Sequence, residues 1–483
     1  MPEQILLQGK ILGTEEFLLA GSAEGRSARS AGEDQLTGRS QWITLIGEAL
    51  PRALLAELGL ARILLGSSGG GQFLIVLPGE VREAAESFLT KAANHMREMS
   101  GGYVRLIWAF TDNLGDWAVI RKRLNEVLDR EQNAPLAGAV DSARFAPYLP
   151  ANSGEHDAYF AKELAAKVRE AQAIGWSPEA PAKVTIGEGK YTWPLTSNLS
   201  HDGIMVARHA APSDDGKQIA PVQTLARRAQ GRSIWGVLRG DVDSFGLRLR
   251  RVHSIEEHVP LSVLYKQFFA GELEVICSLP EFWKKVTVIY SGGDDFAVYG
   301  SWDALIGLAR EVQRLFHRFT EENLKDYPGA EGKTISMAIA LAPETYYPLA
   351  SVYEEAGRNL DLAKAADRDC IYLLGRILEW KRLNDAAELK DTVTRLVHDF
   401  RMSRHFLDQL RSFYRHEDSA DQVQKTWRFQ RRFNRVLSGT RDREFQKLRA
   451  HLIGEIMGRK TTEVKLRPSG LVALEWARLA TEV

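Results

Sequence analysis

The chain has 483 residues, enough for roughly two to four domains that each bury a core. Hydrophobic residues make up 44% of it and charged residues 26%, which excludes a wholly disordered or fibrous protein. The 63 Lys and Arg balance the 63 Asp and Glu, although residues 381–483 alone carry 22 basic and 14 acidic side chains.

The cysteine count and the hydropathy pattern restrict the class of protein further. Cys277 and Cys370 are the two cysteines of the sequence, so a disulfide framework and a four-cysteine zinc site are excluded within this chain. No run reaches the ~18 consecutive apolar residues of a membrane span, and the first residues do not form a secretory signal. We therefore expect a cytoplasmic protein that has no contact with a membrane.

The first 140 residues are predicted to form a β-α-β-β-α-β unit, which is the ferredoxin-like arrangement. Alternation of apolar residues indicates the strands, and apolar residues at helical spacing indicate the helices. These elements are expected at residues 5–10, 65–76, 81–92, 103–110 and 116–130. The second of them is a hairpin with the Gly-rich tip Ser68-Gly69-Gly70.

Two segments of the N-terminal half have weaker patterns. Residues 21–40 are rich in Gly and Ser, which predicts a mobile loop between the first strand and the first helix of the unit. Residues 141–225 contain scattered Pro and Gly and predict an irregular domain between two units, without a zinc site. Its clearest feature is an apolar-periodic helix over residues 159–173.

Residues 226–378 repeat the first unit. Without gaps, Ser68-Gly69-Gly70 aligns with Ser291-Gly292-Gly293, and Phe73 aligns with Phe296. The run from residue 6 to 10 parallels residues 237 to 241, and later elements are expected at residues 305–319, 334–342 and 350–366. Two Gly-rich hairpins can agree by coincidence, but agreement in order over six elements favours a duplication. The sequence therefore predicts an α+β protein with two ferredoxin-like domains.

The second unit carries carboxylates where the first has none. Asp241 ends its first strand, and Asp294 and Asp295 form the hairpin tip, where the first unit has Gly71 and Gln72. Neighbouring antiparallel strands bring these three acids together, where they repel one another unless a cation neutralises them. Mg²⁺ or Mn²⁺ fits such oxygen ligands, and paired ions can activate a hydroxyl and stabilise a departing pyrophosphate. The alternative is a polar hairpin turn, for which Asp and Gly are favoured.

Neighbouring residues are candidates for contacts with phosphate. Gly292 and Gly293 allow the backbone to turn tightly and to approach a triphosphate without an intervening Cβ atom. Lys364, on the last helix of the unit, can reach a triphosphate, although a lysine on a helix is commonly just solvated. We expect Asp243 to be structural or a helix cap, because the strand should end before it.

Residues 379–483 are predicted to form a basic helical domain, with few Pro or Gly before Gly439. Arginines at i, i+3, i+4 and i+7 share one helix face, with Trp427, Phe429 and Phe433 between them. These arginines are Arg428, Arg431, Arg432 and Arg435. Such a face is either solvated or contacts RNA phosphates or an acidic protein neighbour.

The Asp241-Val242-Asp243 strand end, the Tyr290-Ser-Gly-Gly-Asp-Asp-Phe296 hairpin and the acid-free Ser68-Gly69-Gly70 hairpin before them resemble the large subunit of type III CRISPR–Cas effector complexes. That family has two palm domains, of the type found in nucleotide cyclases and polymerases. The resemblance implies conversion of ATP to cyclic oligoadenylate messengers in antiviral defence, switched on by target RNA. It also implies partners: other subunits, among them a small helical one that packs on the C-terminal helices, and guide and target RNA bound through the complex.

Position by position, the resemblance implies three groups of site residues. The metals of the donor ATP would be held by Asp241, Asp294 and Asp295. Its phosphates would be lined by Ser291, Gly292 and Gly293. The acceptor ATP would be seated across the palm–palm interface by Ser68, Gly69 and Gly70 of the degenerate palm. An acceptor 3′-hydroxyl would then attack the α-phosphate of the donor, and pyrophosphate would leave.

The sequence departs from the family in two respects. Many members begin with an HD nuclease domain that cleaves single-stranded DNA, but the first palm strand is expected at about residue 5, so we expect no such nuclease in this chain. The pairs His201-Asp202 and His398-Asp399 lack the flanking helices and partner histidines of that nuclease, and we interpret them as incidental. The cysteine quartet that often builds a zinc site between the palms is also absent from the sequence.

Two other functions remain open at this point. One is a stand-alone nucleotidyl cyclase similar to GGDEF proteins, which would make its product without a guide complex. The other is a non-catalytic subunit whose palm merely binds a nucleotide. Loss of the acids from the first hairpin and their presence in the second argue against the non-catalytic subunit.

Overall fold

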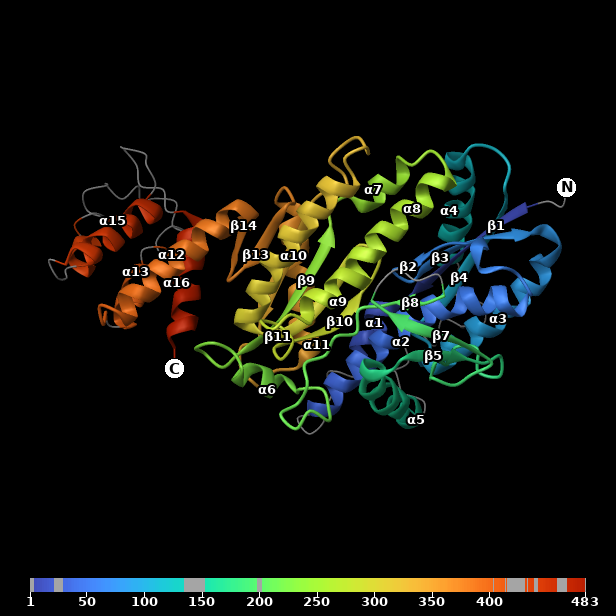
Figure 1. The fold of residues 1–483 in the computed structure, drawn as a ribbon, viewed down its shortest axis with the longest axis horizontal. Helices are drawn as coiled ribbons and strands as arrows, with labels where there is room; N and C mark the ends of the chain where they lie inside the picture. Colours follow the sequence, from blue (N-terminus) through green and yellow to red (C-terminus); the bar gives the residue numbers. More distant parts are fainter. Residues whose placement is uncertain are drawn as a thin grey trace.

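The computed structural model describes residues 4–20, 29–133, 153–197, 202–402, 404–412, 414, 431, 433–437, 442–457 and 467–482. Figure 1 shows an elongated molecule in which the chain runs from one end to the other. The first sheet lies near the N-terminus, the second sheet lies in the middle, and the C-terminal helices form the opposite end. The predicted α+β class with two ferredoxin-like domains is confirmed.

The first palm contains a four-stranded antiparallel sheet in the order β2-β3-β1-β4. Its strands are β1 (Gln4–Leu12), β2 (Leu65–Gly69), β3 (Gln72–Pro78) and β4 (Arg105–Asp112). Its helices are α1 (Thr14–Leu19), α2 (Arg29–Glu57), α3 (Arg82–Met99) and α4 (Trp117–Asn133). This strand order is the one that a β-α-β-β-α-β unit adopts when it folds as a ferredoxin-like sheet.

The second palm repeats this order and extends it, as β10-β11-β9-β12-β13-β14. Its strands are β9 (Trp235–Val242), β10 (Val286–Ser291), β11 (Asp295–Ser301), β12 (Ile335–Leu341), β13 (Cys370–Leu373) and β14 (Arg376–Glu379). Its helices are α7 (Phe245–Arg250), α8 (Ile255–Lys266), α9 (Leu273–Cys277), α10 (Trp302–Asn323) and α11 (Leu349–Ala365). The short hairpin of β13 and β14 was not predicted from the sequence.

One packing detail is repeated in the two palms. Gly9 pairs with Phe73 across β1 and β3, and Gly240 pairs with Phe296 across β9 and β11. In both pairs the phenylalanine ring fills the space of the missing glycine side chain, because an added Cβ would lie 2.1 Å from a ring atom of Phe73 and 2.3 Å from one of Phe296. The same register and the same glycine–phenylalanine contact at aligned positions support the predicted duplication.

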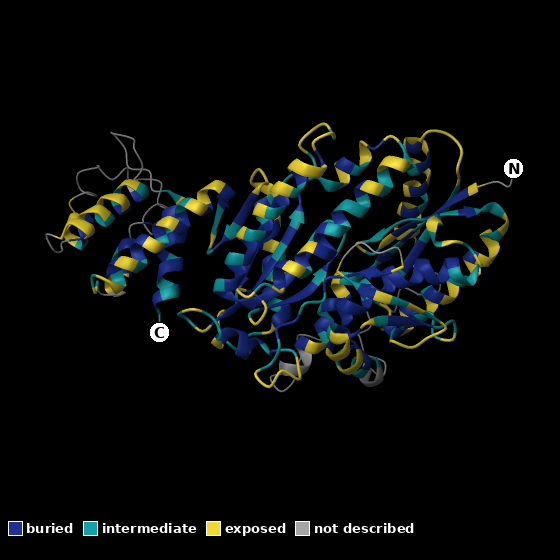
Figure 2. Ribbon diagram, viewed as in Figure 1, coloured by how far each residue is buried: buried dark blue, intermediate teal, exposed yellow. Residues whose placement is uncertain are grey.

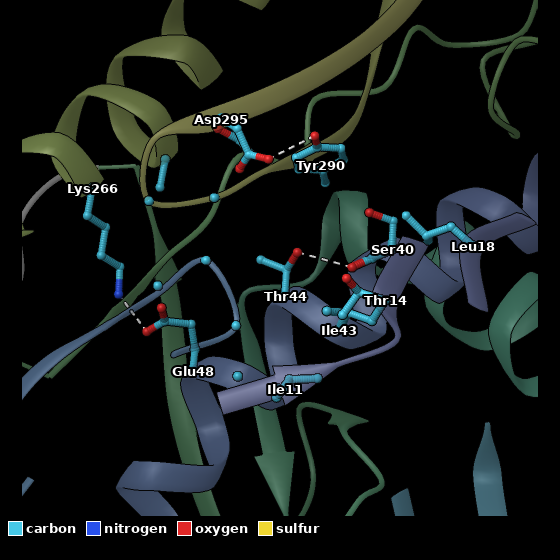
Figure 3. A pocket seen from close by; sticks show the side chains of 18 of the residues that line it. Ile11, Thr14, Leu18, Ser40, Ile43, Thr44, Glu48, Lys266, Tyr290 and Asp295 are labelled. Atoms are coloured by element: carbon cyan, nitrogen blue, oxygen red, sulfur yellow. Dashed lines mark hydrogen bonds and ion pairs between the residues drawn. The ribbon is translucent and has the colours of Figure 1, made fainter. Parts of the chain in front are cut away.

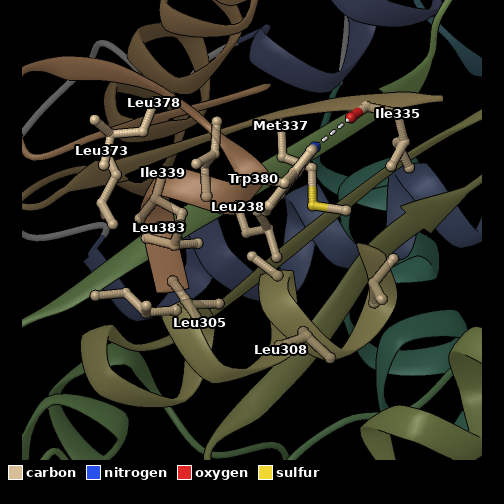
Figure 4. Packing of buried hydrophobic residues seen from close by; sticks show 14 of the residues in the cluster. Leu238, Leu305, Leu308, Ile335, Met337, Ile339, Leu373, Leu378, Trp380 and Leu383 are labelled. Carbon is tan, nitrogen blue, oxygen red and sulfur yellow. Dashed lines mark hydrogen bonds between the residues drawn. The ribbon is translucent and has the colours of Figure 1, made fainter. Parts of the chain in front are cut away.

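The two faces of the second sheet have different coverings. Leu238, Met337 and Ile339 face α10, where they pack against Leu305 and Leu308. Figure 4 shows this core with Trp380 among these residues; its indole nitrogen donates a hydrogen bond to the Ile335 carbonyl at 2.9 Å. Since side chains alternate along a strand, the residues between them point to the other face.

The opposite face of the second sheet is covered by α11. Val237, Ala297 and Tyr299 form a cluster there with the α11 residues Val352 and Tyr353. Figure 2 shows the strands of the second sheet as mostly buried, with many of the exposed residues on the outer surfaces of the helices and in loops. Asp241 and Asp295 continue the Val237 and Ala297 rows at the strand ends, so the acids belong to the α11 face.

The region between the palms contains a sheet of its own, in the order β6-β5-β7-β8. Its strands are β5 (Ala173–Trp176), β6 (Thr185–Ile186), β7 (Tyr191–Thr196) and β8 (Ile204–Met205), followed by the short helix α6 (Val222–Arg227). The helix predicted over residues 159–173 was wrong at its C-terminal end. The helical segment α5 (Ser153–Ala158) continues through π-helical Tyr159–Ala165 and a turn at Val168–Glu170, but Ala173 already pairs with β7.

The loop predicted over residues 21–40 was wrong from residue 29 onwards, where α2 begins. Its small residues serve close packing rather than flexibility. An added Cβ on Gly38 would lie 1.9 Å from the carbonyl oxygen of Phe160, and Ser40 donates a hydrogen bond to the Ile289 carbonyl at 2.6 Å. Residues 21–28 of this prediction lie outside the described residues.

The C-terminal helices are α12 (Trp380–His398), α13 (Arg404–Ser412), α15 (Arg443–Met457) and α16 (Pro468–Thr481). Of the predicted basic face, Arg431 and Arg435 are exposed and Phe433 is buried. Arg428 and Arg432 lie outside the described residues, as do Trp427 and Phe429. No helix in the described part of the chain has both the length and the apolar character that crossing a membrane requires.

Candidate active site

The structure brings the three predicted aspartates to one end of the second sheet. Asp241 on β9 lies directly opposite Asp295 on β11 in the antiparallel register. Asp294 precedes Asp295 at the hairpin tip, where its carbonyl accepts a hydrogen bond from the Val242 backbone at 2.9 Å. The tip itself is closed by a hydrogen bond from the Gly292 amide to the Asp295 carbonyl at 2.8 Å.

Burial raises the pKa of all three carboxylates, and neighbouring acids add to this for Asp294 and Asp295. Burial raises the pKa of Asp294 to about 8, with further contributions from Asp295 and Asp241. Burial and the Asp241 charge likewise raise the pKa of Asp295 to about 6, and burial raises the pKa of Asp241. Like charges in a partly buried corner disfavour ionisation, and a bound cation would favour the charged form of these acids.

Two side chains partly compensate the acids. Lys364 on α11 places its Nζ atom 2.8 Å from Oδ1 of Asp241, and both side chains remain partly exposed. The Tyr290 hydroxyl donates a hydrogen bond to Oδ2 of Asp295 at 3.0 Å (Figure 3). The sequence predicted that Lys364 contacts phosphate. The structure places its ammonium group beside Asp241, near the end of β9.

The acids fit a divalent cation that also binds a substrate phosphate. Within the part of the chain that the structure describes, no group of three or more His, Cys, Asp and Glu side chains, the three aspartates included, is arranged so that it could hold a metal ion by itself. Mg²⁺ commonly uses one or two carboxylates and takes its remaining ligands from water and substrate phosphates. A pair of opposed carboxylates with raised pKa values, at the end of a sheet, suits that mode of binding.

Asp243 is not part of this cluster. It is 4% exposed, and its carboxylate accepts hydrogen bonds from Thr334 Oγ1 at 2.8 Å, Ser336 Oγ at 2.7 Å and the Asp369 amide at 3.0 Å. These contacts join the end of β9 to β12 and to the loop before β13. The structural role that the sequence predicted for Asp243 agrees with this placement.

The tips of the two Gly-rich hairpins meet across the palm–palm interface. An added Cβ on Gly292 would lie 3.3 Å from Cα of Gly70, and one on Gly70 would lie 3.3 Å from the backbone nitrogen of Gly293. The two tips border a cavity of about 210 Å³ that is also lined by Asp295. Figure 3 shows residues of both palms around this cavity, from β1 and α2 on one side and the second hairpin on the other.

Serine residues at the two tips are placed differently. Ser291 is 4% exposed, and its hydroxyl donates to the Phe269 carbonyl, so its side chain anchors the hairpin. Ser68 is less buried and donates a hydrogen bond to Oε2 of Glu48 at 2.9 Å, while Lys266 donates to Ser68 Oγ at 3.2 Å. The hydroxyl of Ser68 is therefore part of a charged network that sequence reasoning missed.

That network is an ion pair between the palms. Lys266 on α8 lies 2.6 Å from the Glu48 carboxylate on α2, and Arg52 lies 2.7 Å from the same oxygen. Burial favours the neutral acid, but Lys266 and Arg52 outweigh it and lower the pKa of Glu48 to about 2. In the sequence, the i, i+4 spacing of Glu48 and Arg52 is the only sign of this network. The pairing with Lys266 has no such sign, because α8 and α2 are far apart along the chain.

A second missed contact lies across the cavity. Arg239 on β9 forms an ion pair with Glu15 on α1 at 3.0 Å, and its guanidinium lies 4.3 Å from the ring centre of Tyr353. It projects from the same face of β9 as Asp241, two residues away. Arg239 therefore links α1 of the first palm to α11 of the second at the wall of the cavity.

The two His-Asp pairs show no site geometry among the described residues. Asp202 has an 83% exposed side chain and pairs with Arg62 at 3.7 Å, while His201 lies outside the described residues. His398 and Asp399 are both exposed at the end of α12, where Asp399 pairs with Arg395 at 3.4 Å.

Sequence comparisons relate the second palm to a known family. Residues 234–372 match the family model for the second palm domain of Cas10/Cmr2. The chain is 23% identical over 438 residues to a Cas10/Csm1 protein of Mycobacterium tuberculosis, covering 74% of this chain and 52% of that protein. It is 24% identical over 452 residues to one from Thermococcus onnurineus, covering 77% and 55%. Both are described as CRISPR system single-strand-specific deoxyribonucleases of subtype III-A. The chain thus spans about half the length of these two relatives.

Solved structures share the fold along the whole chain. A Csm1–Csm4 cassette without ligand matches with a TM-score of 0.75 and 19% identity, covering 100% of this chain and 70% of that one. The cassettes in complex with cA4 and with AMPPNP each match with a TM-score of 0.72 and 19% identity, with the same coverage. At this identity the likeness establishes the arrangement of two palms and the regions around them.

Proposed function

Because this chain is related to the Cas10/Csm1 proteins in sequence and fold, we propose that it is a large subunit of a type III CRISPR–Cas effector complex that converts ATP to cyclic oligoadenylate. One observation carries the proposal. Asp241 and Asp295 oppose each other at the end of the second sheet, beside a cavity where the Gly-rich tips of both palms meet. A nucleotidyltransferase needs acids and close backbone approach in one such place.

We propose that Asp241, Asp294 and Asp295 bind Mg²⁺ or Mn²⁺ together with the phosphates of the donor ATP. The bound ion would supply Lewis-acid stabilisation of charge on the phosphates. Gly292 and Gly293 let the backbone approach the phosphates, and Lys364 adds a positive charge beside Asp241. Tyr290 orients Asp295 by its hydrogen bond. The acceptor 3′-hydroxyl would lose its proton to solvent water as its oxygen bonds to the donor α-phosphorus. The bond from the α-phosphorus to the oxygen that bridges to the β-phosphate would break, and pyrophosphate would leave.

The acceptor ATP is proposed to lie against the first palm. Ser68, Gly69 and Gly70 border the region where the hairpin tips meet, but this palm has Lys10 opposite Gln72 where the second palm has Asp241 opposite Asp295. A nucleotide on this side can be positioned but finds no opposed pair of acids at the strand ends. Placing two nucleotides against facing tips accounts for much of the rate enhancement that such transfer requires, because positioning lowers its entropic barrier.

Several properties of the assembly are proposed on the same basis. The guide and target RNA would be bound through the complex, and a small helical subunit would pack on the C-terminal helices. The exposed Arg431 and Arg435 lie in that region and suit an acidic or phosphate-bearing neighbour. We also propose that the protein acts in the cytoplasm.

The test is product formation by the assembled complex. The complex containing this chain is incubated with each NTP and Mg²⁺, with and without target RNA, and products are identified by mass. We expect cyclic oligoadenylate from ATP, and only with target RNA. Product from the isolated chain would instead indicate a stand-alone cyclase. The same assembly with Asp294→Ala and Asp295→Ala should assemble and make no product; unchanged product would refute the site.

A further inference from the structure

A small cavity behind the first hairpin is rich in positive charge. It has a volume of about 150 Å³ and is lined by Arg52, Arg62 and Lys266, together with the hydroxyl-bearing Ser67 and Ser262. Three basic side chains around one cavity repel one another unless an anion lies between them. None of these three residues was singled out by the sequence.

The acids of the described residues do not neutralise this charge fully. The Glu48 carboxylate contacts both Arg52 and Lys266 and so serves two cations with one charge. Arg62 has Asp202 at 3.7 Å, but that acid is 83% exposed and is therefore screened by water. Burial and the neighbouring Arg52 lower the pKa of Arg62, and burial lowers the pKa of Lys266.

Two guanidinium nitrogens have hydrogen-bonding capacity left over. Nε of Arg52 and Nη1 of Arg62 are buried and have no hydrogen-bond partner in the described part of the chain. Arg52 is only 6% exposed, so water does not readily replace a missing partner. A buried donor without an acceptor is destabilising, and arginine pairs preferentially with the oxygens of carboxylate and phosphate.

The cavity adjoins the site between the palms. Lys266 and Met205 line both cavities, and Ser68 of the smaller one precedes Gly69 and Gly70 of the larger one. An anion in the smaller cavity can therefore belong to a molecule whose remainder lies between the hairpin tips. The acids of the second palm do not line the smaller cavity, so binding there requires no metal.

We propose that Arg52, Arg62 and Lys266 form a second phosphate site, which binds a polyphosphate group independently of the three aspartates. The group is either the phosphate tail of a nucleotide seated between the palms or free pyrophosphate. That a nucleotide lies between the palms rests on the proposed function, whereas the affinity for polyphosphate does not. Arg52 and Lys266, which pair with Glu48, would then also contact the ligand. Binding would therefore weaken the ion pair between the palms.

The experiment measures binding without metal. The full chain in EDTA is titrated calorimetrically with pyrophosphate, then with ATP and AMP as competitors. We expect Arg62→Gln to weaken pyrophosphate binding about tenfold or more, because a charge-assisted contact is lost. Glu48→Gln removes the competing carboxylate and should strengthen binding. Arg318→Gln, at an exposed ion pair on α10, is the control and should bind like the unchanged chain.

The outcomes separate the possibilities. Competition by ATP but not by AMP identifies the nucleotide tail as the ligand, and failure of ATP to compete identifies free pyrophosphate. Absence of pyrophosphate binding, or equal binding by the Arg62→Gln chain, would overturn the proposal. If Glu48→Gln lowers the thermal stability, the rise in unfolding temperature on adding pyrophosphate is compared instead. A larger rise in the Glu48→Gln chain than in the unchanged chain would also show stronger binding. A complex that makes no product while the chain binds pyrophosphate through Arg62 would refute the proposed function and leave this site intact.

Discussion

The Nζ atom of Lys364 lies 2.8 Å from Oδ1 of Asp241, so one acid of the candidate site already has a positive partner before any cation binds. Asp295, directly opposite, has the Tyr290 hydroxyl as its partner and no comparable ion pair among the described residues. The lysine therefore occupies the place of a counter-ion at one of the two opposed carboxylates.

Replacing Lys364 by Gln should change metal binding and catalysis in opposite directions. Mn²⁺ should bind more tightly in the absence of ATP, because no ammonium group competes for Asp241. Product formation at saturating Mg²⁺ should fall about tenfold or more, because a positive charge near the phosphates is lost. Calorimetry with Mn²⁺ and a rate assay measure the two effects, with Lys364→Arg as the control that keeps the charge. Weaker Mn²⁺ binding in the glutamine variant would contradict this.

The stability of the metal-free protein should depend on pH through the aspartate cluster. Folding raises the pKa of Asp294 from 3.8 to about 8, so its contribution is fully present below the unfolded value and is lost as pH rises towards 8. Relative to Asp294→Asn, the free energy of unfolding in EDTA should therefore fall from pH 5 to pH 8 by roughly 3–4 kcal/mol. Denaturant titration measures it. Mg²⁺ with a nucleotide should remove this difference in pH dependence between the unchanged chain and Asp294→Asn. Parallel pH profiles of the two chains in EDTA would contradict the prediction.

Adding a methyl group at Gly292 should separate the hairpin tips. The new Cβ would lie 2.9 Å from Oδ1 of Asp295 and 3.3 Å from Cα of Gly70, so the acid and the facing backbone must both move. We expect Gly292→Ala to lower the product rate at least tenfold, because small misplacements are costly in transfer reactions. Gly246→Ala is the matched control, since nothing lies within 4 Å of its added Cβ. Equal rates for the two variants would show that the tips need not meet.

The glycine–phenylalanine contacts should matter for stability in both palms. Gly240→Ala places a Cβ 2.3 Å from the Phe296 ring, and Gly9→Ala places one 2.1 Å from the Phe73 ring. Overpacking of this kind destabilises a core by about 1–3 kcal/mol. Thermal and denaturant unfolding should show a loss in both variants. If the double variants with Phe296→Leu and Phe73→Leu fail to recover stability, the ring is not the cause of the loss.

The sequence was sufficient for those parts of the fold in which local pattern and tertiary structure agree. The repeated hairpins at Ser68-Gly69-Gly70 and Ser291-Gly292-Gly293 carry turn residues, and the strands around them alternate in the usual way. The juxtaposition of Asp241 with Asp295 could be predicted because a ferredoxin-like order puts these strands side by side. Both predictions follow from rules that act over short distances along the chain or within one sheet.

Other features depend on contacts that no local pattern encodes. Residues 29–40 form a helix although they are rich in small residues, because Gly38 allows close contact with a segment that follows more than a hundred residues later. Glu48 and Lys266 come from different palms, and their pairing becomes apparent only when the hairpin tips are brought together. Buried ion pairs of this kind leave no periodicity in the sequence.

The facing strand ends are chemically unequal, with Lys10 opposite Gln72 in one half and Asp241 opposite Asp295 in the other. A duplicated chain with matching halves would treat its two occupants alike, and either could act as electrophile. If the chain acts as proposed, its two occupants would not be able to exchange roles. Under the proposed function, each new bond would form with the same polarity, and growth would proceed in one direction until the two ends of a short strand meet and close.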